Sequence, residues 1–228
     1  MAKKNNGNIS NAGNAGKSGL RQVVYLHGLQ SSGQSTTAQR LRRTLSKYEV
    51  ISPDLSVAPE VALTELKRLG AQLRPDAIIV GTSMGGFFAQ MFRGFRRILI
   101  NPSWHVSRKL AESEGQRLPF HNPRLDGLKD FEVTQKLVKK YERLEAQQWD
   151  KKTGVIGKNA DDPSQVTALF GTQDTVVNGR EEYLEHYTDF REFEGGHRLD
   201  PNTTITLVVP LIEGEGREPE TDPVPDAD

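Results

Sequence analysis

The chain has 228 residues, with 30 Lys and Arg against 30 Asp and Glu, and it contains no cysteine. This length suits one large α/β domain. A net charge of zero gives no reason to expect nucleic acid or an anionic membrane surface as a partner, and no segment approaches the length of a transmembrane helix. The lack of cysteine excludes disulfides and cysteine-ligated metals. It suits a reducing compartment, and we expect a cytoplasmic protein because the N-terminal residues also lack the apolar stretch of a secretory signal.

The two ends of the chain differ in composition from the rest. Residues 1–20 are rich in Asn, Gly and Ser, and residues 213–228 carry seven carboxylates and three prolines. Such segments have too little to bury, so both are predicted to be disordered tails. This leaves residues 21–212 as a single domain, and a partner-binding role for either tail stays open.

Short apolar runs alternate with helical patterns between the tails. The predicted strands are 23–26, 50–51, 77–80, 98–100, 165–170 and 190–193, and the predicted helices cover 35–48, 63–73 and 87–92. This alternation predicts an α/β fold, a mostly parallel sheet with helices on both faces. Residues 203–209 are β-branched and locally resemble a strand, but the topology requires a closing helix there, which we favour.

A charged segment, residues 105–160, interrupts this alternation. It contains one long helical pattern, from Phe131 to Trp149. An insertion at this place would lie over the carboxyl ends of the strands and cover a site there as a helical cap. The alternative is a peripheral excursion without contact to the site.

The run Gly81-Thr82-Ser83-Met84-Gly85 follows the predicted strand 77–80 and precedes a helix. This is a G-x-S-x-G motif in the context that a nucleophile elbow requires. The strand must reverse into a helix within a few residues, which strains the serine and leaves no room for side chains at Gly81 and Gly85. The motif predicts Ser83 as a nucleophile at the positive end of a helix, the alternative being a plain turn.

A serine nucleophile needs a base to accept its proton and a carboxylate to orient that base. Asp174 follows the predicted strand 165–170, and His197 follows Gly195-Gly196. The order Ser, acid, His is that of an α/β-hydrolase, so we predict Asp174 as the acid and His197 as the base. An ordinary turn aspartate is the alternative for Asp174, and His105 is a rival base that breaks this order.

Acyl transfer also needs two backbone N–H groups aimed at one oxyanion. One donor is expected from Met84, directly after the nucleophile. The other is expected from Leu29, because His27-Gly28 lets the loop after the first strand turn in close. His27 itself is predicted to be structural.

Cofactors and metals are not expected, since the chain lacks both G-x-G-x-x-G and H-E-x-x-H spacing. Trp104 and His105 follow the predicted strand 98–100 and are possible pocket-lining residues. Phe87 and Phe88 are further candidates. Ordinary core packing is the alternative for these aromatic residues.

These motifs together resemble the α/β-hydrolase superfamily and, more closely, the small bacterial YqiA/YcfP-like esterases. The matching segments are residues 25–29 with Ser31-Ser32, residues 81–86, Asn101-Pro102, residues 171–174 and residues 194–197. The resemblance implies a serine esterase of small acyl esters with Ser83, Asp174 and His197 as its triad. We extend this hypothesis to thioesters, and an acyltransferase with the same triad or a non-catalytic binding protein of the same fold are the alternatives.

Overall fold

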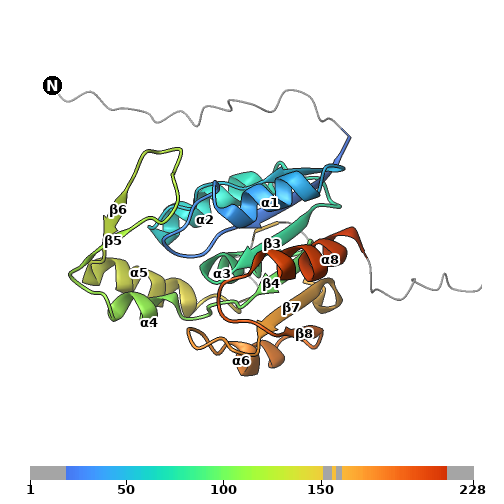
Figure 1. Ribbon diagram of the computed structural model, residues 1–228. Helices are drawn as coiled ribbons and strands as arrows, with labels where there is room; N and C mark the ends of the chain where they lie inside the picture. The colour runs from blue at the N-terminus through green and yellow to red at the C-terminus, as the bar shows by residue number, and fades with distance from the viewer. Residues whose placement is uncertain (1–18, 151–155, 158–160, 215–228) are drawn as a thin grey trace, which may run out of the picture.

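The computed structural model describes residues 19–150, 156–157 and 161–214, so the predicted tails lie outside the described residues except for 19–20 and 213–214. A six-stranded parallel sheet forms the centre, in the order β2-β1-β3-β4-β7-β8 (Figure 1). Its strands are β1 (Arg21–Leu26), β2 (Tyr48–Ile51), β3 (Ile78–Thr82), β4 (Arg96–Ile100), β7 (Val166–Gly171) and β8 (Phe190–Phe193). The predicted parallel sheet is confirmed.

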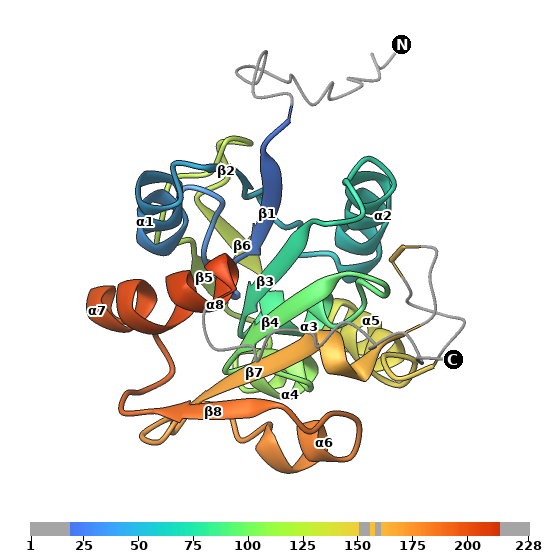
Figure 2. The ribbon, with the colours of Figure 1, turned by 90° about the vertical axis from the view of Figure 1, so that its right-hand side faces the viewer.

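Helices cover both faces of this sheet, as predicted (Figure 2). One face carries α1 (Thr36–Thr44), α7 (Pro201–Thr203), the π-helical turn η2 (Thr204–Val208) and α8 (Val209–Glu213). The other carries α2 (Pro59–Gly70), α3 (Met84–Ala89), α4 (Val106–Ala111), α5 (Gln135–Glu145) and α6 (Arg180–Leu184). Successive side chains of a strand point to opposite faces. Along β1, Val23 therefore packs into the core below α1 and α8, and Val24 packs into the core on the other face of the sheet.

The closing segment is helical, as favoured, although its β-branched residues locally resemble a strand. Asp200 caps its start by accepting hydrogen bonds from the N–H groups of Asn202 and Thr203. The hydroxyl of Thr204 donates to the Asp200 carbonyl, which satisfies it within the helix. Burial of Val208 and Ile212 against the sheet outweighs the local strand preference.

All four predicted helices have wrong boundaries, and the one predicted over 63–73 is α2, which begins at Pro59 and ends at Gly70. The helix predicted from Phe131 to Trp149 is only α5, because residues 130–132 form β6 (Asp130–Glu132), which pairs with β5 (Arg117–Pro119). The Thr134 hydroxyl then accepts a hydrogen bond from the Leu137 N–H and starts the helix. Tyr48 begins β2 instead of ending α1, and α3 ends before residues 90–92. The short 3₁₀ turn η1 (Pro163–Gln165) takes the first residue of the strand predicted over 165–170.

The insert at 105–160 contacts the elements that carry the predicted site. The His121 N–H donates to the Gln30 carbonyl at 2.8 Å, in the loop after β1. On α5, the Tyr141 hydroxyl donates to the Met84 sulfur at 3.2 Å, on the elbow helix. The described part of the insert therefore contacts the loop after β1 and the elbow helix, while its role as a cap stays a prediction.

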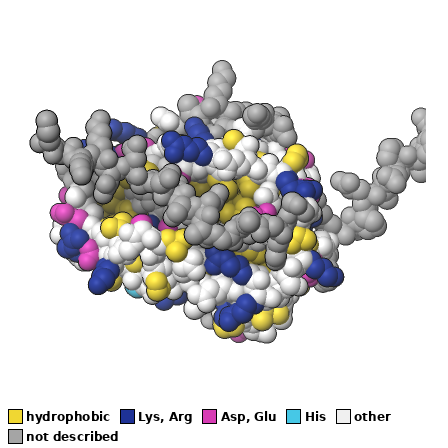
Figure 3. All heavy atoms as spheres, turned by 90° about the horizontal axis from the view of Figure 1, so that it is seen from above, with side chains coloured by type: hydrophobic (Ala, Val, Ile, Leu, Met, Phe, Trp, Pro, Cys, Tyr) yellow, Lys and Arg dark blue, Asp and Glu magenta, His cyan; other side chains and the backbone are white. Residues whose placement is uncertain are grey.

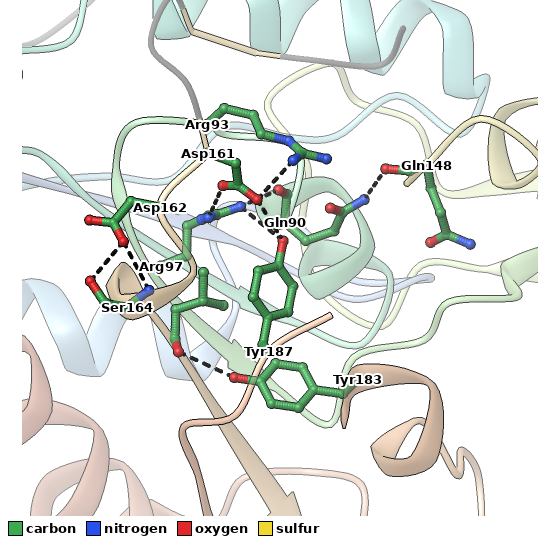
Figure 4. Close-up of polar contacts among 10 residues, drawn as sticks. Gln90, Arg93, Arg97, Gln148, Asp161, Asp162, Ser164, Tyr183 and Tyr187 are labelled. Atoms are coloured by element: carbon green, nitrogen blue, oxygen red, sulfur yellow. Dashed lines mark hydrogen bonds and ion pairs between the residues drawn. The ribbon is translucent and has the colours of Figure 1, made fainter. Parts of the chain in front are cut away.

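A second polar group of side chains lies at the amino end of β4, away from the predicted site (Figure 4). This buried arginine cluster consists of Arg93, Arg97, Asp161, Gln90 and Tyr187. Both arginines form ion pairs with the Asp161 carboxylate, and Arg97 also donates to the Gln90 carbonyl at 2.6 Å. The Arg97 guanidinium further lies 5.5 Å from the centre of the Tyr187 ring. The cluster ties the segment before β7 to the sheet.

Charged side chains are dispersed over the face drawn in Figure 3. In Figure 3, Lys and Arg side chains are spread around the margin of the face among neutral and hydrophobic ones. None of the helices in the described ranges is long and apolar enough to cross a membrane.

Candidate active site

Ser83 occupies the sharp turn between β3 and α3, with φ of 56° and ψ of −120°. A Cβ added at Gly81 would lie 2.2 Å from the Gly85 carbonyl oxygen, and one at Gly85 would lie 2.0 Å from the Leu26 carbonyl oxygen. Only glycine fits at either position, which is the physical reason for the spacing of the motif. The turn holds Ser83 in a backbone conformation that non-glycine residues rarely adopt.

The structure brings Ser83, His197 and Asp174 together in a continuous chain of contacts. The His197 Nε2 lies 2.9 Å from the Ser83 Oγ, and its Nδ1 lies 2.8 Å from Asp174 Oδ2. The other carboxylate oxygen accepts hydrogen bonds from the N–H groups of Val176 and Val177 at 2.8 and 3.1 Å. These bonds fix the carboxylate, which in turn orients the imidazole.

The loop after β1 lies directly against the elbow. A Cβ added at Gly28 would come within 3.3 Å of the Ser83 Cβ, so the backbone of this loop approaches the serine closely. Within the described part of the chain, the N–H groups of Leu29 and Met84 have no hydrogen-bond acceptor. Leu29 and Met84 therefore stay the predicted oxyanion donors.

His27 is structural in its contacts, as predicted. Its side chain is buried, its Nδ1 lies 2.8 Å from the Gly28 carbonyl, and its Nε2 accepts a hydrogen bond from the Leu55 N–H at 2.9 Å. Burial lowers the pKa of His27 to about 4. The neutral ring thus joins the loop after β1 to the segment after β2.

Asn101 is a further site residue whose part the sequence did not indicate. It is buried, with φ of +41°, and follows β4. Its Nδ2 donates to the carbonyls of Gly196 and His197, both at 3.1 Å, while its Oδ1 accepts from the Gly171 N–H at 2.8 Å. One side chain thus joins the loop of the histidine to the strand end that leads to Asp174. Asn before Pro after a strand was the available signal, since Asn tolerates positive φ.

Backbone strain concentrates around this group. Among the described residues, Gln30, Ser83 and Asn101 are the non-glycine residues with positive φ. They follow the carboxyl ends of β1, β3 and β4, which are neighbours in the sheet. Strained residues that cluster in this way are typical of functional sites.

The predicted pocket residues differ in where they lie. Trp104 and His105 line a cleft, Phe87 and Phe88 do not, and Trp104 is buried in the same core as Phe87 and Phe88. His105 is a rival base no longer, because its Nε2 lies 2.8 Å from Glu182 and it does not contact Ser83. In the described ranges, no group of three or more His, Asp or Glu side chains is placed to hold a metal ion.

A model of the family described as "Uncharacterised protein family (UPF0227)" matches residues 22–200. The matched segment includes Ser83, Asp174 and His197. Solved structures with a similar fold cover most of the chain. Mouse alpha/beta hydrolase domain-containing protein 10 is 15% identical with a TM-score of 0.56, covering 85% of this chain and 88% of its own.

Two further structures give the same picture. The monoacylglycerol lipase of Paleococcus ferrophilus is 16% identical with a TM-score of 0.55, covering 85% of this chain and 93% of its own. A thioesterase domain from the curacin biosynthetic pathway is 14% identical with a TM-score of 0.51, covering 86% and 90%. At such identities the likeness shows the α/β-hydrolase fold and leaves the substrate open.

Proposed function

Since the chain belongs to the UPF0227 family and has the α/β-hydrolase fold, we propose that it is a serine hydrolase. It would cleave carboxylic esters or thioesters of small acyl groups through an acyl-Ser83 intermediate. Ser83 is the proposed nucleophile, His197 the general base and acid, and Asp174 the carboxylate that holds the imidazole. Leu29 and Met84 are the proposed oxyanion donors.

In this mechanism, the Ser83 Oγ attacks the substrate carbonyl while His197 Nε2 accepts the hydroxyl proton. The imidazolium is stabilised by Asp174, towards which Nδ1 points. The N–H groups of Leu29 and Met84 would bind the oxyanion of the tetrahedral intermediate. His197 then donates the proton to the leaving group. A water molecule, activated by the same imidazole, attacks the acyl-serine, and the acid is released with Ser83 restored.

The observation that carries the proposal is the strained serine in line with the imidazole and carboxylate, at 2.9 and 2.8 Å. An ordinary Gly-Ser turn would not require a hydrogen-bonded histidine from a segment 114 residues away. The names of two structural neighbours, a lipase and a thioesterase, support hydrolysis of esters or thioesters. A cytoplasmic location stays a prediction from the sequence.

The test is turnover of a panel of p-nitrophenyl esters and acyl thioesters by the wild type and by Ser83→Ala. We expect the wild type to hydrolyse at least one of them and the variant to lose at least about three orders of magnitude in kcat. Thermal unfolding of both proteins controls for folding. Undiminished turnover by Ser83→Ala would exclude the acyl-serine mechanism. Product analysis with added alcohols or amines separates hydrolysis from acyl transfer.

A further inference from the structure

A cleft of about 220 Å³ lies between the segments that follow β4 and β7. The Ser103 N–H, on one wall, donates to the Ser83 carbonyl at 3.1 Å. Val176 and Val177, on the other wall, donate their N–H groups to the Asp174 carboxylate. Backbone bonded to two members of the proposed triad thus forms part of both walls of the cleft.

The two walls are held at a fixed separation. The Trp104 indole N–H donates to the Gly179 carbonyl across the cleft at 2.7 Å, and the Trp104 side chain is buried. A Cβ at Gly179 would lie 2.7 Å from the Pro102 carbonyl oxygen, so the walls touch at this point. The cleft is therefore preorganised, and its size suits a small group better than a long acyl chain.

Most basic side chains that line this cleft lie against carboxylates. His105 lies 2.8 Å from the Glu182 carboxylate and 4.0 Å from that of Glu145, and Lys109 lies 2.6 Å from the Glu112 carboxylate. Arg108, on α4, also lines the cleft, but within the described ranges its guanidinium has no carboxylate partner. Arg108 is therefore the one cationic side chain lining the cleft that no carboxylate of the described ranges holds.

We propose that this cleft binds an anionic group of the substrate, a carboxylate or a phosphate, and that Arg108 is its cationic partner. This deepens the proposed function and rests on it. A guanidinium suits such groups because its planar N–H donors match two oxygens at once. The anion could belong to the acyl group or to the leaving group. The alternative is an arginine that is only solvated at the surface.

The test uses two matched pairs of esters, one for each source of the anion. Mono-p-nitrophenyl glutarate against p-nitrophenyl pentanoate places the charge on the acyl side. The second pair compares 4-acetoxybenzoate with its methyl ester, which places the charge on the leaving group. The readout for each pair is the ratio of kcat/KM for the anionic ester to that for the neutral ester, because effects common to both esters cancel.

This ratio is compared in the wild type, Arg108→Met and Arg108→Glu. Arg143→Met is the matched control, since Arg143 is an exposed arginine on α5 that does not line the cleft. We expect Arg108→Met to lower the ratio at least about tenfold for one pair, the effect of losing a charge-assisted hydrogen bond. Arg108→Glu should lower it further, and added salt should lower it in the wild type but not in Arg108→Met.

An unchanged ratio in both Arg108 variants, for both pairs, would overturn the subsite while the hydrolase proposal stands, because the neutral esters would still be turned over. A fall of similar size in Arg143→Met would also overturn it, since the effect would then come from net charge. If the wild type hydrolyses none of the four esters and Ser83 also resists a fluorophosphonate, the proposed function fails first.

Discussion

Two polar groups lie at opposite ends of the same strand, β4, and they are built differently. At its carboxyl end lies Asn101, beside Ser83 at the end of the neighbouring strand β3, and both are strained residues with positive φ. At its amino end, Arg97 and the rest of the buried arginine cluster lie on backbone without such strain among the described residues. The two ends therefore differ first in backbone strain, which is present at the carboxyl end and absent from the arginine cluster.

They differ also in how completely their polar atoms are bonded. Asn101 uses both polar atoms of its side chain, and both ring nitrogens of His197 have partners. In the arginine cluster, by contrast, the Nε atoms of Arg93 and Arg97 and the Oε1 of Gln90 are buried without a partner in the described part of the chain. A complete network fixes one geometry, which catalysis needs, whereas an incomplete one still suffices to hold a segment in place.

The largest effect on activity is expected from Asp174→Asn. The amide can still accept the N–H groups of Val176 and Val177 but no longer stabilises an imidazolium, and it favours the wrong tautomer of His197. We expect kcat/KM for an ester substrate to fall about 10³- to 10⁴-fold with little change in the unfolding temperature. A loss of less than about tenfold would mean that this end of β4 does not work as a triad.

Asn101 joins the loop of His197 to the strand end before Asp174, so it acts on the triad through its hydrogen bonds. Asn101→Ala removes its hydrogen bonds and adds strain at φ of +41°, whereas Asn101→Gly removes the bonds without that strain. We expect both to lower kcat about 100-fold, with a smaller change in KM, because the imidazole is misplaced. Kinetics and thermal unfolding are measured together. If Asn101→Gly kept the kcat of the wild type, Asn101 would have only a structural role.

Arg97→Met tests the other end of the strand. Its removal breaks the ion pair with Asp161, though Arg93 still partners that carboxylate, so we expect a loss of about 3 kcal/mol in the free energy of unfolding. Below the unfolding transition, kcat/KM should match the wild type. The free energy of unfolding is measured with urea. Arg43→Met, which removes an exposed arginine on α1, is the control variant. A selective loss of kcat would contradict the division between the two ends.

The smallest effect is expected from His27 and depends on pH. Its pKa of about 4 lies below the ordinary value of 6.5, so the unfolded chain takes up the proton first as the pH falls. Its stabilising contribution is complete above about pH 6.5 and is lost progressively towards pH 4, with about 2 kcal/mol gone at pH 5. His27→Asn carries no such proton. Urea unfolding at about pH 7 and 5 should show a smaller difference in the variant, and an equal difference would contradict this assignment.

The sheet and the Ser-Asp-His candidates could be predicted because their signals are local. Apolar runs mark the strands, glycines mark the elbow, and the chain order assigns the acid and the base. The β5–β6 hairpin was not predicted, because each of its strands has only three residues and lies in a charged segment. The end of the predicted helix at Trp149 was also wrong, because nothing local to residues 146–149 distinguishes a turn from a further helical turn.

The roles of Asn101 and Arg97 could not be predicted for a different reason. Each depends on partners that are distant in the sequence, such as Gly196 for Asn101 and Asp161 for Arg97. A buried arginine in a strand is also contrary to the usual composition of a core. Sequence patterns thus predict the elements and the motif residues, whereas the residues that position them follow only from the folded structure.

The most direct test of the central claim is covalent labelling of the folded protein with a fluorophosphonate, read by intact mass, in the wild type and Ser83→Ala. One adduct on the wild type and none on the variant is the predicted result, because only a serine activated by His197 reacts at an appreciable rate. Folding of both proteins is checked by thermal unfolding in the same buffer. A folded wild type that stays unlabelled, or a Ser83→Ala variant labelled as readily, would contradict the account.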